Sequence, residues 1–200
     1  MVRHYCQTCL RPKTACICQF VSKVENRVRV LVLQHPSEVK QSKGTLTLLA
    51  HSLAHCQVIV GEDFSDNLEL RQILAHYQER VFLLYPSENA EALPGTGELA
   101  EGLEEYCLIL LDATWKKAYR MFMLSKPLHT ITHCRLPEGI QGQYVILTTK
   151  KAHALSTLEA CCYALGALEK AEQKYTGLLA AFNQFNQFQL RFRQQGGNAV

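Results

Sequence analysis

The chain alternates short apolar runs with longer amphipathic segments. Runs rich in Val, Ile and Leu that end at Pro, Gly or polar residues predict strands over residues 28–33, 57–61, 80–85, 107–111 and 144–147, with a further short strand over 129–134. Apolar residues at spacings of three and four predict helices over 44–55, 66–78, 114–125, 157–173 and 177–193. Residues 89–105 are acidic, contain Pro and Gly, and are expected to form a loop.

This order of elements predicts an α/β fold. Strands that alternate with helices and are apolar throughout are typical of a mostly parallel sheet covered on both faces. Ligands bind such sheets at the carboxyl ends of the strands. The chain contains neither a G-x-G-x-x-G nor a Walker A sequence, which argues against a dinucleotide site or a P-loop. It also lacks the G-x-S-x-G sequence of α/β-hydrolases.

Size and composition narrow the class further. The 200 residues, 48% apolar and 20% charged, are typical of one globular domain or of one domain with a small appendage. No apolar run approaches the ~20 residues of a membrane helix, and the first residues do not resemble a signal peptide. We therefore expect a cytoplasmic protein with no membrane partner, and the sequence does not indicate its oligomeric state.

Charge is distributed unevenly along the chain. Residues 1–43 carry 8 Lys and Arg against 2 Asp and Glu, and residues 113–153 carry 7 against 1. The segment between them, 44–112, carries 2 against 12. Two basic segments favour a face that binds a polyanion such as nucleic acid, because phosphate contacts require clustered Lys and Arg. An ordinary solvated surface is the alternative.

Four of the nine cysteines lie close together near the N-terminus, as Cys6, Cys9, Cys16 and Cys18 in a C-x2-C-x6-C-x-C pattern. In a reducing compartment such a cluster indicates a metal before a disulfide. Four thiolates can close a tetrahedron around zinc at ~2.3 Å per bond, and a closed site of this kind is structural. We expect a small zinc knob over residues 1–25, with a redox pair or a disulfide as the alternative.

The other five cysteines are Cys56, Cys107, Cys134, Cys161 and Cys162. Cys107 begins the most apolar of the expected strands, and Cys161 and Cys162 lie within an apolar expected helix. We expect them to be buried and not to act as nucleophiles.

Asp112 directly follows the strand expected over 107–111 and is followed by Thr114 and the only Trp of the chain, Trp115. One interpretation is a helix cap, in which Asp112 or Thr114 accepts hydrogen bonds from backbone N–H groups and Trp115 packs on its own helix. The other is a catalytic or ligand-binding carboxylate beside an aromatic platform, at the edge of the sheet where sites are built.

Ser156 and Glu159 match a helix capping box, with Ser at the cap and Glu three residues later. A structural cap explains this match completely. The N-terminus of the same helix also suits an anion such as a carboxylate, and both roles hold if the ligand lies just outside the cap.

Four motifs follow one another in a familiar order. They are the cysteine pattern, His35-Pro36-x-Glu38, Leu111-Asp112-Ala113-Thr114-Trp115, and Leu155-Ser156-Thr157-Leu158-Glu159-Ala160. Together, over residues 6–193, they resemble the DTW-domain family of tRNA-uridine aminocarboxypropyltransferases, which is related to the knotted SPOUT methyltransferases. The chain has Ala113 where the family usually has Gly, and Leu147 where an Arg usually follows three residues after Tyr144.

The resemblance implies an α/β domain over 26–200 with a C-terminal SPOUT-like trefoil knot. It implies transfer of the 3-amino-3-carboxypropyl group of S-adenosylmethionine to N3 of a uridine in tRNA, with release of methylthioadenosine. The residues that it places around the donor are Tyr85, Pro86, Ser87, Glu88, Leu111, Asp112, Arg135, Leu136, Tyr144, Leu155, Ser156, Thr157 and Glu159.

On this interpretation Asp112, assisted by Thr114 and Trp115, is the catalytic group, and burial would raise its pKa so that it can act as a base. The residues expected to contact tRNA are Arg11, Lys13, His35, Glu38, Lys116, Lys117, Arg120, Lys150 and Lys151. A SPOUT-type RNA methyltransferase and a non-catalytic RNA-binding module are the alternatives.

Overall fold

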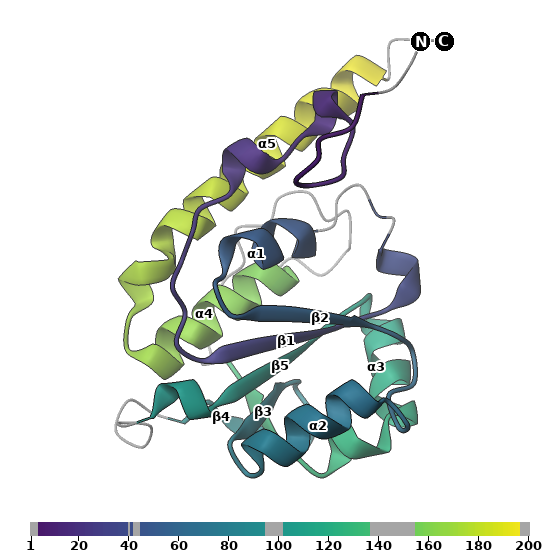
Figure 1. Cartoon of the computed structure of the whole chain (residues 1–200), viewed down its shortest axis with the longest axis vertical. Helices are drawn as coiled ribbons and strands as arrows, with labels where there is room; N and C mark the ends of the chain where they lie inside the picture. The colour runs from purple at the N-terminus through teal and green to yellow at the C-terminus, as the bar shows by residue number, and fades with distance from the viewer. Residues whose placement is uncertain (1–3, 40, 42–44, 95–101, 137–154, 197–200) are drawn as a thin grey trace.

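The computed structural model describes residues 4–39, 41, 45–94, 102–136 and 155–196. The six strands of these residues form one parallel sheet in the order β2-β1-β5-β3-β6-β4 (Figure 1). Their bounds are β1 Arg29–Gln34, β2 Cys56–Val60, β3 Val81–Leu84, β4 Glu91–Ala92, β5 Cys107–Asp112 and β6 Thr132–Arg135. The α/β fold with a mostly parallel sheet is therefore confirmed.

Five α-helices accompany the sheet in the described residues: α1 Leu46–Ser52, α2 Leu68–Tyr77, α3 Trp115–Leu124, α4 Thr157–Glu169 and α5 Thr176–Gly196. Two of them, α1 and α4, are shorter than the periodicity predicts by four or more residues. The first ends at Ser52 because Leu53 is extended and forms a bridge with Val24. The helix expected over 157–173 ends at Glu169, because the next residue, Lys170, adopts a left-handed conformation with φ 51°.

Two further differences lie near the edge of the sheet. The loop expected over 89–105 contains the two-residue strand β4, which pairs with β6 and is too short to leave a pattern in the sequence. The strand expected over 129–134 begins only at Thr132, after a 3-10 turn over Lys126–His129. The strand expected over 144–147 lies outside the described residues, as does the segment that would carry the knot, so both stay predictions.

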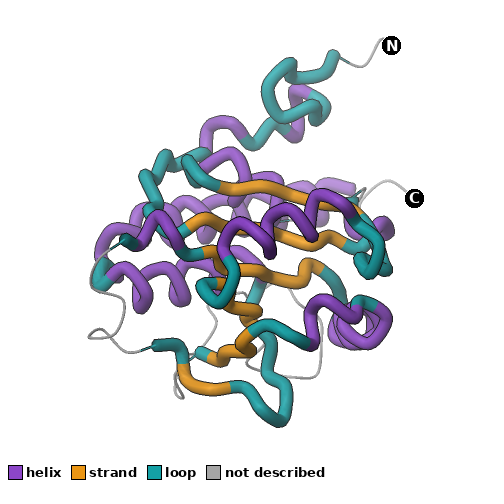
Figure 2. Tube along the Cα trace, turned by 60° about the horizontal axis from the view of Figure 1, so that its bottom comes forward, coloured by secondary structure: helices purple, strands orange, loops and turns teal. Residues whose placement is uncertain are grey.

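Alternate residues of each strand face opposite layers of helices. Val30 and Val32 of β1 belong to an apolar cluster with α1, α4 and α5, whereas Leu31 and Leu33 belong to a second cluster with α2 and α3. Helices accordingly lie in front of and behind the strands (Figure 2). Burial on both faces explains why the strands are apolar throughout instead of alternating with polar residues.

The N-terminal segment packs along α5, as the purple and yellow chains of Figure 1 show. Ile17 is fully buried in the same apolar cluster as Phe182 and Phe185 of α5. The Phe20 ring lies 5.9 Å from the Phe185 ring and 5.2 Å from that of Phe188. The cysteine-bearing segment therefore shares its core with the helix, although the division at residue 25 stays a prediction.

We expect Phe185→Ala to lower the free energy of unfolding by about 3–5 kcal/mol, because the buried ring joins α5 to the N-terminal segment and its loss leaves a cavity. Urea denaturation measures the change. Gln184→Ala, on the exposed side of the same helix, should stay within about 0.5 kcal/mol of the parent. Equal effects of the two substitutions would contradict the packing described here.

Candidate functional site

Asp112 is the last residue of β5 and lies beside Gln34, the last residue of β1, with which it is in register. Gln34 donates a hydrogen bond from Nε2 to Asp112 Oδ2 at 2.8 Å. Thr157, the first residue of α4, donates from Oγ1 to Asp112 Oδ1 at 2.7 Å. The carboxylate thus joins the carboxyl ends of two strands to the N-terminus of a helix.

The N-terminus of α4 carries the predicted capping box. Ser156 Oγ accepts a hydrogen bond from the Glu159 backbone N–H at 3.2 Å, and the Ser156 backbone N–H donates to Glu159 Oε2 at 2.9 Å. Both residues are buried. This reciprocal cap fixes the start of the helix, and with it the position of the Thr157 hydroxyl, against the end of β5.

Burial raises the pKa of the Asp112 carboxyl above its ordinary value, as expected from the sequence, and the negative charge of nearby Glu38 adds to the rise. The hydrogen bonds from Thr157 and Gln34 favour the charged form and oppose it. Trp115, which the sequence analysis placed beside Asp112, is itself 58% exposed.

A cavity of about 420 Å³ opens at this edge of the sheet, lined by the ends of β3, β5 and β6 and the starts of α3 and α4. Eight of the predicted donor-binding residues line it: Tyr85, Pro86, Leu111, Arg135, Leu136, Leu155, Ser156 and Thr157. Trp115, predicted as a catalytic residue, lines it too. The structure thus brings together segments that are far apart in the sequence.

The other predicted site residues lie differently. Asp112 does not itself line the cavity, although both of its neighbours do, and it reaches the wall through its hydrogen bond with Thr157. Thr114 is the exposed N-cap of α3 and makes no capping hydrogen bond with its side chain, so the simple capping interpretation fails. Three predicted residues, Tyr144, Lys150 and Lys151, are outside the described ranges.

Three predicted donor-binding residues, Ser87, Glu88 and Glu159, do not line the cavity. Ser87 Oγ lies 2.8 Å from His133 Nδ1. Glu88 is exposed, and Glu159 is occupied by the cap. The lining of the cavity therefore does not by itself support a donor contact by these three residues.

Sequence reasoning missed several residues of this region. Gln34 is a polar residue at a strand end, a signal equivalent to that of Asp112, and it could have been found in the same way. The others are apolar or small residues of the wall, namely Leu84, Leu110, Ala118, Cys134 and Ala160. Their residue types give no signal beyond burial.

The predicted RNA contacts on α3 and after β1 are partly engaged within the protein. Lys117 Nζ donates to Glu38 Oε1 at 2.9 Å, and Arg120 Nε lies 2.8 Å from Glu62 Oε1. The His35 ring accepts a hydrogen bond from the Ser37 backbone N–H. A phosphate that binds Lys117 or Arg120 must therefore compete with a carboxylate.

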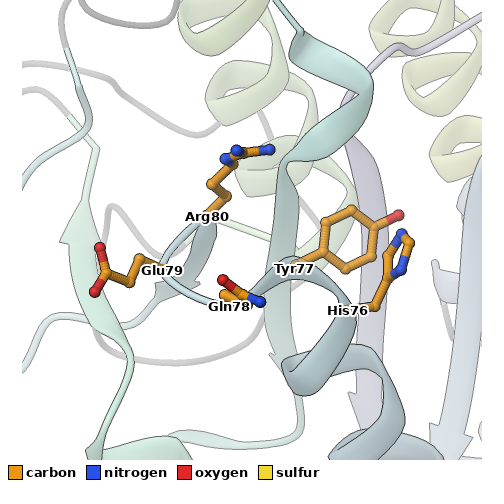
Figure 3. Close-up of a pocket in the computed structure, with 5 residues that line it drawn as sticks. All are labelled: His76, Tyr77, Gln78, Glu79 and Arg80. Atoms are coloured by element: carbon orange, nitrogen blue, oxygen red, sulfur yellow. The ribbon is translucent and has the colours of Figure 1, made fainter.

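A second cavity, of about 300 Å³, lies at the opposite edge of the sheet (Figure 3). It is lined by His76, Tyr77, Gln78, Glu79 and Arg80, which join the end of α2 to the start of β3. Parallel α/β sheets hold their ligands at the carboxyl edge. This amino-edge hollow is therefore not the candidate site.

The four clustered cysteines are brought together by the fold. The sulfur atoms of Cys6, Cys9, Cys16 and Cys18 all lie within 4.8 Å of one another. Cys6 Sγ lies 3.6 Å from Cys18 Sγ, and Cys9 Sγ lies 3.8 Å from Cys16 Sγ. All nine cysteines are free, so the disulfide alternative is not realised in this structure. The cluster can hold a metal ion.

The remaining five cysteines are buried or half-buried, as expected. Burial raises the pKa to about 12 for Cys56, Cys107, Cys134 and Cys162, and raises that of Cys161 well above its ordinary value. A thiol that stays protonated at neutral pH is a poor nucleophile. The prediction that these residues are structural agrees with this environment.

The family model described as the DTW domain matches residues 3–190. The chain belongs to the DTW-domain family. Two relatives of this DTW protein are both called tRNA-uridine aminocarboxypropyltransferase 2. The protein from Drosophila melanogaster is 30% identical over 94% of this chain and 76% of its own length. The protein from Mus musculus is 29% identical over 96% of this chain and 66% of its own length.

No solved structure matches this DTW domain. Among its described residues, no helix is both long enough and apolar enough to cross a membrane.

Replacement of Asp112 by Asn tests the environment of this carboxylate in the DTW domain. Because the folded-state pKa is raised, the folded protein holds the proton more tightly than the unfolded chain, so this group's contribution to stability is lost as pH rises through the raised pKa. The free energy of unfolding is measured in urea between about pH 4 and 7. As pH rises, the value for Asp112→Asn should increase relative to that of the parent.

Asp63 provides a control of opposite sign. Hydrogen bonds from Ser65 lower the pKa of the exposed Asp63 carboxyl, so its contribution is present at neutral pH and is lost on acidification. In a series extended to more acidic solution, Asp63→Asn should therefore lose stability relative to the parent as pH rises to about 4. A difference between Asp112→Asn and the parent that is constant with pH would contradict the raised pKa.

Proposed function

We propose that this protein transfers the 3-amino-3-carboxypropyl group of S-adenosylmethionine to N3 of a uridine in tRNA and releases methylthioadenosine. The names of the relatives support this activity. The structural observation that carries the proposal is the hydrogen bond from Thr157 to Asp112, which ties the catalytic candidate to the wall of the cavity at the carboxyl edge of the sheet. We propose a cytoplasmic location for the same activity.

The cavity fits a donor of this chemistry. Its volume of about 420 Å³ lies within the ~300–1,000 Å³ that is usual for small-molecule sites. Leucines and Pro86 offer an apolar wall for the adenine ring of the donor. Just outside the cap formed by Ser156 and Glu159, the first turn of α4 offers N–H groups and the positive end of a helix dipole to the carboxylate of the donor. We also propose that the C-terminal part of the chain forms a SPOUT-like knot and that Tyr144 contacts the donor.

Within this site the chain itself positions groups and moves one proton. Asp112 takes the weakly acidic proton from N3 of the uridine, and the raised pKa of its carboxyl suits a base. The N3 lone pair then forms a bond with the donor carbon, while the bond from that carbon to sulfur breaks and its electron pair leaves with methylthioadenosine. Orientation selects this carbon over the methyl group, so placement by Ser156 and Thr157 should dominate the rate.

For tRNA we propose contacts by Lys116, which is exposed beside Trp115, and by Arg11 and Lys13 of the cysteine segment. Lys117 and Arg120 contribute once phosphates replace Glu38 and Glu62 as their partners. These residues hold the backbone and do not select the target base.

We further propose that the four-cysteine cluster holds a structural zinc ion. A tetrahedron with zinc–sulfur bonds of ~2.3 Å has edges of about 3.8 Å, close to the 3.6 and 3.8 Å measured between two pairs of sulfur atoms. Such an ion would close the loop formed by residues 6–18 and hold it against α5. It has no open position and takes no part in the transfer.

The transfer is tested with S-adenosylmethionine that carries its label in the carboxyl carbon or in the methyl group. Only the carboxyl label should enter tRNA, and the modified nucleoside should be a uridine derivative by mass spectrometry. Entry of the methyl label would indicate a methyltransferase instead. RNA binding that is indifferent to S-adenosylmethionine, with no label transferred, would indicate a binding module.

In the same assay Asp112→Ala should lower the rate by about 10²–10⁴, the usual contribution of a general base. Asp66→Ala is the matched control, because Asp66 is an exposed carboxylate whose ion pair is with Arg71. Circular dichroism checks that both variants fold. Near-normal turnover of Asp112→Ala would remove Asp112 from the catalytic role.

For the metal, we expect about one zinc ion per chain by elemental analysis of the purified protein, as a four-thiolate site implies. Cys9→Ser should lose the ion and lower the melting temperature, since Cys9 is buried in the cluster. Cys56→Ser should retain it. A protein that contains no metal but shows a disulfide among the four cysteines would contradict the proposal.

A further inference from the structure

Large apolar or aromatic side chains are exposed unusually often on α3. The described residues contain nine such side chains, and four of them lie on this ten-residue helix: Trp115, Tyr119, Met123 and Leu124. Trp115 and Tyr119 are each 58% exposed, and Met123 is 51% exposed. Single exposed apolar residues are ordinary, but a contiguous group usually marks a binding surface.

The group is contiguous because of its spacing. Trp115, Tyr119 and Met123 follow one another at intervals of four residues, so each lies one turn beyond the last on the same side of the helix. The opposite side is formed by Ala118 and Met121, which are buried against the sheet. We call Trp115, Tyr119 and Met123 the α3 face.

The α3 face begins at the candidate site. Trp115 lines the cavity, as does Tyr85, whose ring stacks on Phe122 of α3 at 4.7 Å. Tyr119 lies close enough to Tyr85 to contribute, after burial, to the rise in the pKa of the Tyr85 phenol. Aromatic surface therefore continues from the wall of the cavity along the outside of the helix.

The charge around the α3 face favours a polyanion. Residues 113–136 contain no Asp or Glu and five basic residues, which are Lys116, Lys117, Arg120, Lys126 and Arg135. Lys117 and Arg120 are paired with Glu38 and Glu62, which reduces the net positive charge on their side of the helix. Lys116 lies within the helix beside Trp115 and is exposed. Aromatic rings interleaved with Lys and Arg are typical of surfaces that bind unpaired nucleic acid, where bases stack on the rings and phosphates meet the cations.

We propose that the α3 face is a stacking platform for unpaired bases of the RNA that flank the target uridine. The proposal rests on the proposed function for the identity of the target, and it adds that the uridine is presented from a single-stranded segment. Paired RNA keeps its bases stacked on one another and offers no ring faces to Trp115 or Tyr119. The platform would then hold the neighbours while the uridine enters the cavity.

Trp115 makes the platform directly observable, because it is the only Trp of the chain. Titration of the full-length protein with a short unpaired oligouridine should quench the intrinsic tryptophan fluorescence as a base stacks on the ring. An RNA duplex of equal length should quench much less at the same ionic strength. Equal quenching by the two, or none by the oligouridine, would overturn the proposal.

Substitution of Tyr119 separates the platform from the transfer site. Binding of labelled oligouridine, followed by fluorescence anisotropy, should weaken by about tenfold in Tyr119→Ala, within the range usual for one stacked base. Leu68→Ala is the control, since Leu68 is exposed at 72% and lies on α2, which carries none of the residues proposed to contact RNA. Equal loss in both variants, or in neither, would overturn the proposal.

Two further measurements complete the test. Sedimentation should show the same assembly state for the parent and Tyr119→Ala; a change would make the α3 face an interface between copies of the chain and overturn the proposal. If the labelled group is transferred but Tyr119→Ala binds RNA as tightly as the parent, the platform is wrong and the proposed function stands. If Tyr119→Ala weakens RNA binding but no group is transferred, the proposed function is wrong and the platform stands.

Discussion

The hydrogen bond from Thr157 to Asp112 is the interaction on which the candidate site depends. It joins residues 45 positions apart and brings the start of α4 to the end of β5. The capping box of Ser156 and Glu159 fixes the position of Thr157 at the start of α4. Asp112 is held by the register of β1 with β5 and by the hydrogen bond from Gln34. Because Thr157 and Gln34 are held in place independently of each other, the carboxylate stays fixed although no Lys or Arg of the described residues forms an ion pair with it.

The elements that sequence reasoning predicted well are those fixed by local rules. The apolar strands and the capping box have patterns that depend on nearby residues alone, and Asp112 could be placed at the carboxyl edge once β5 was recognised. The cysteine cluster was equally accessible from its spacing. Its sulfur atoms converge as expected.

Features that depend on contacts between distant segments could not be predicted in this way. The ion pairs of Lys117 with Glu38 and of Arg120 with Glu62 join α3 to segments about eighty and sixty residues earlier. The sequence of α3 alone contains no pattern that predicts them. The exposure of Trp115 follows from which side of α3 meets the sheet. Strand β4 is defined only by its partner β6.

The packing of the cysteine segment on α5 has a consequence for how the molecule is made. Residues 6–18 can gather around an ion as soon as they leave the ribosome, because all four sulfur atoms lie within one short stretch. Ile17 and Phe20, however, have their partners in Phe182, Phe185 and Phe188, which are synthesised more than 160 residues later. During translation Ile17 and Phe20 therefore remain exposed until α5 has been synthesised. Chaperones that bind apolar segments of nascent chains would bind this surface in the meantime.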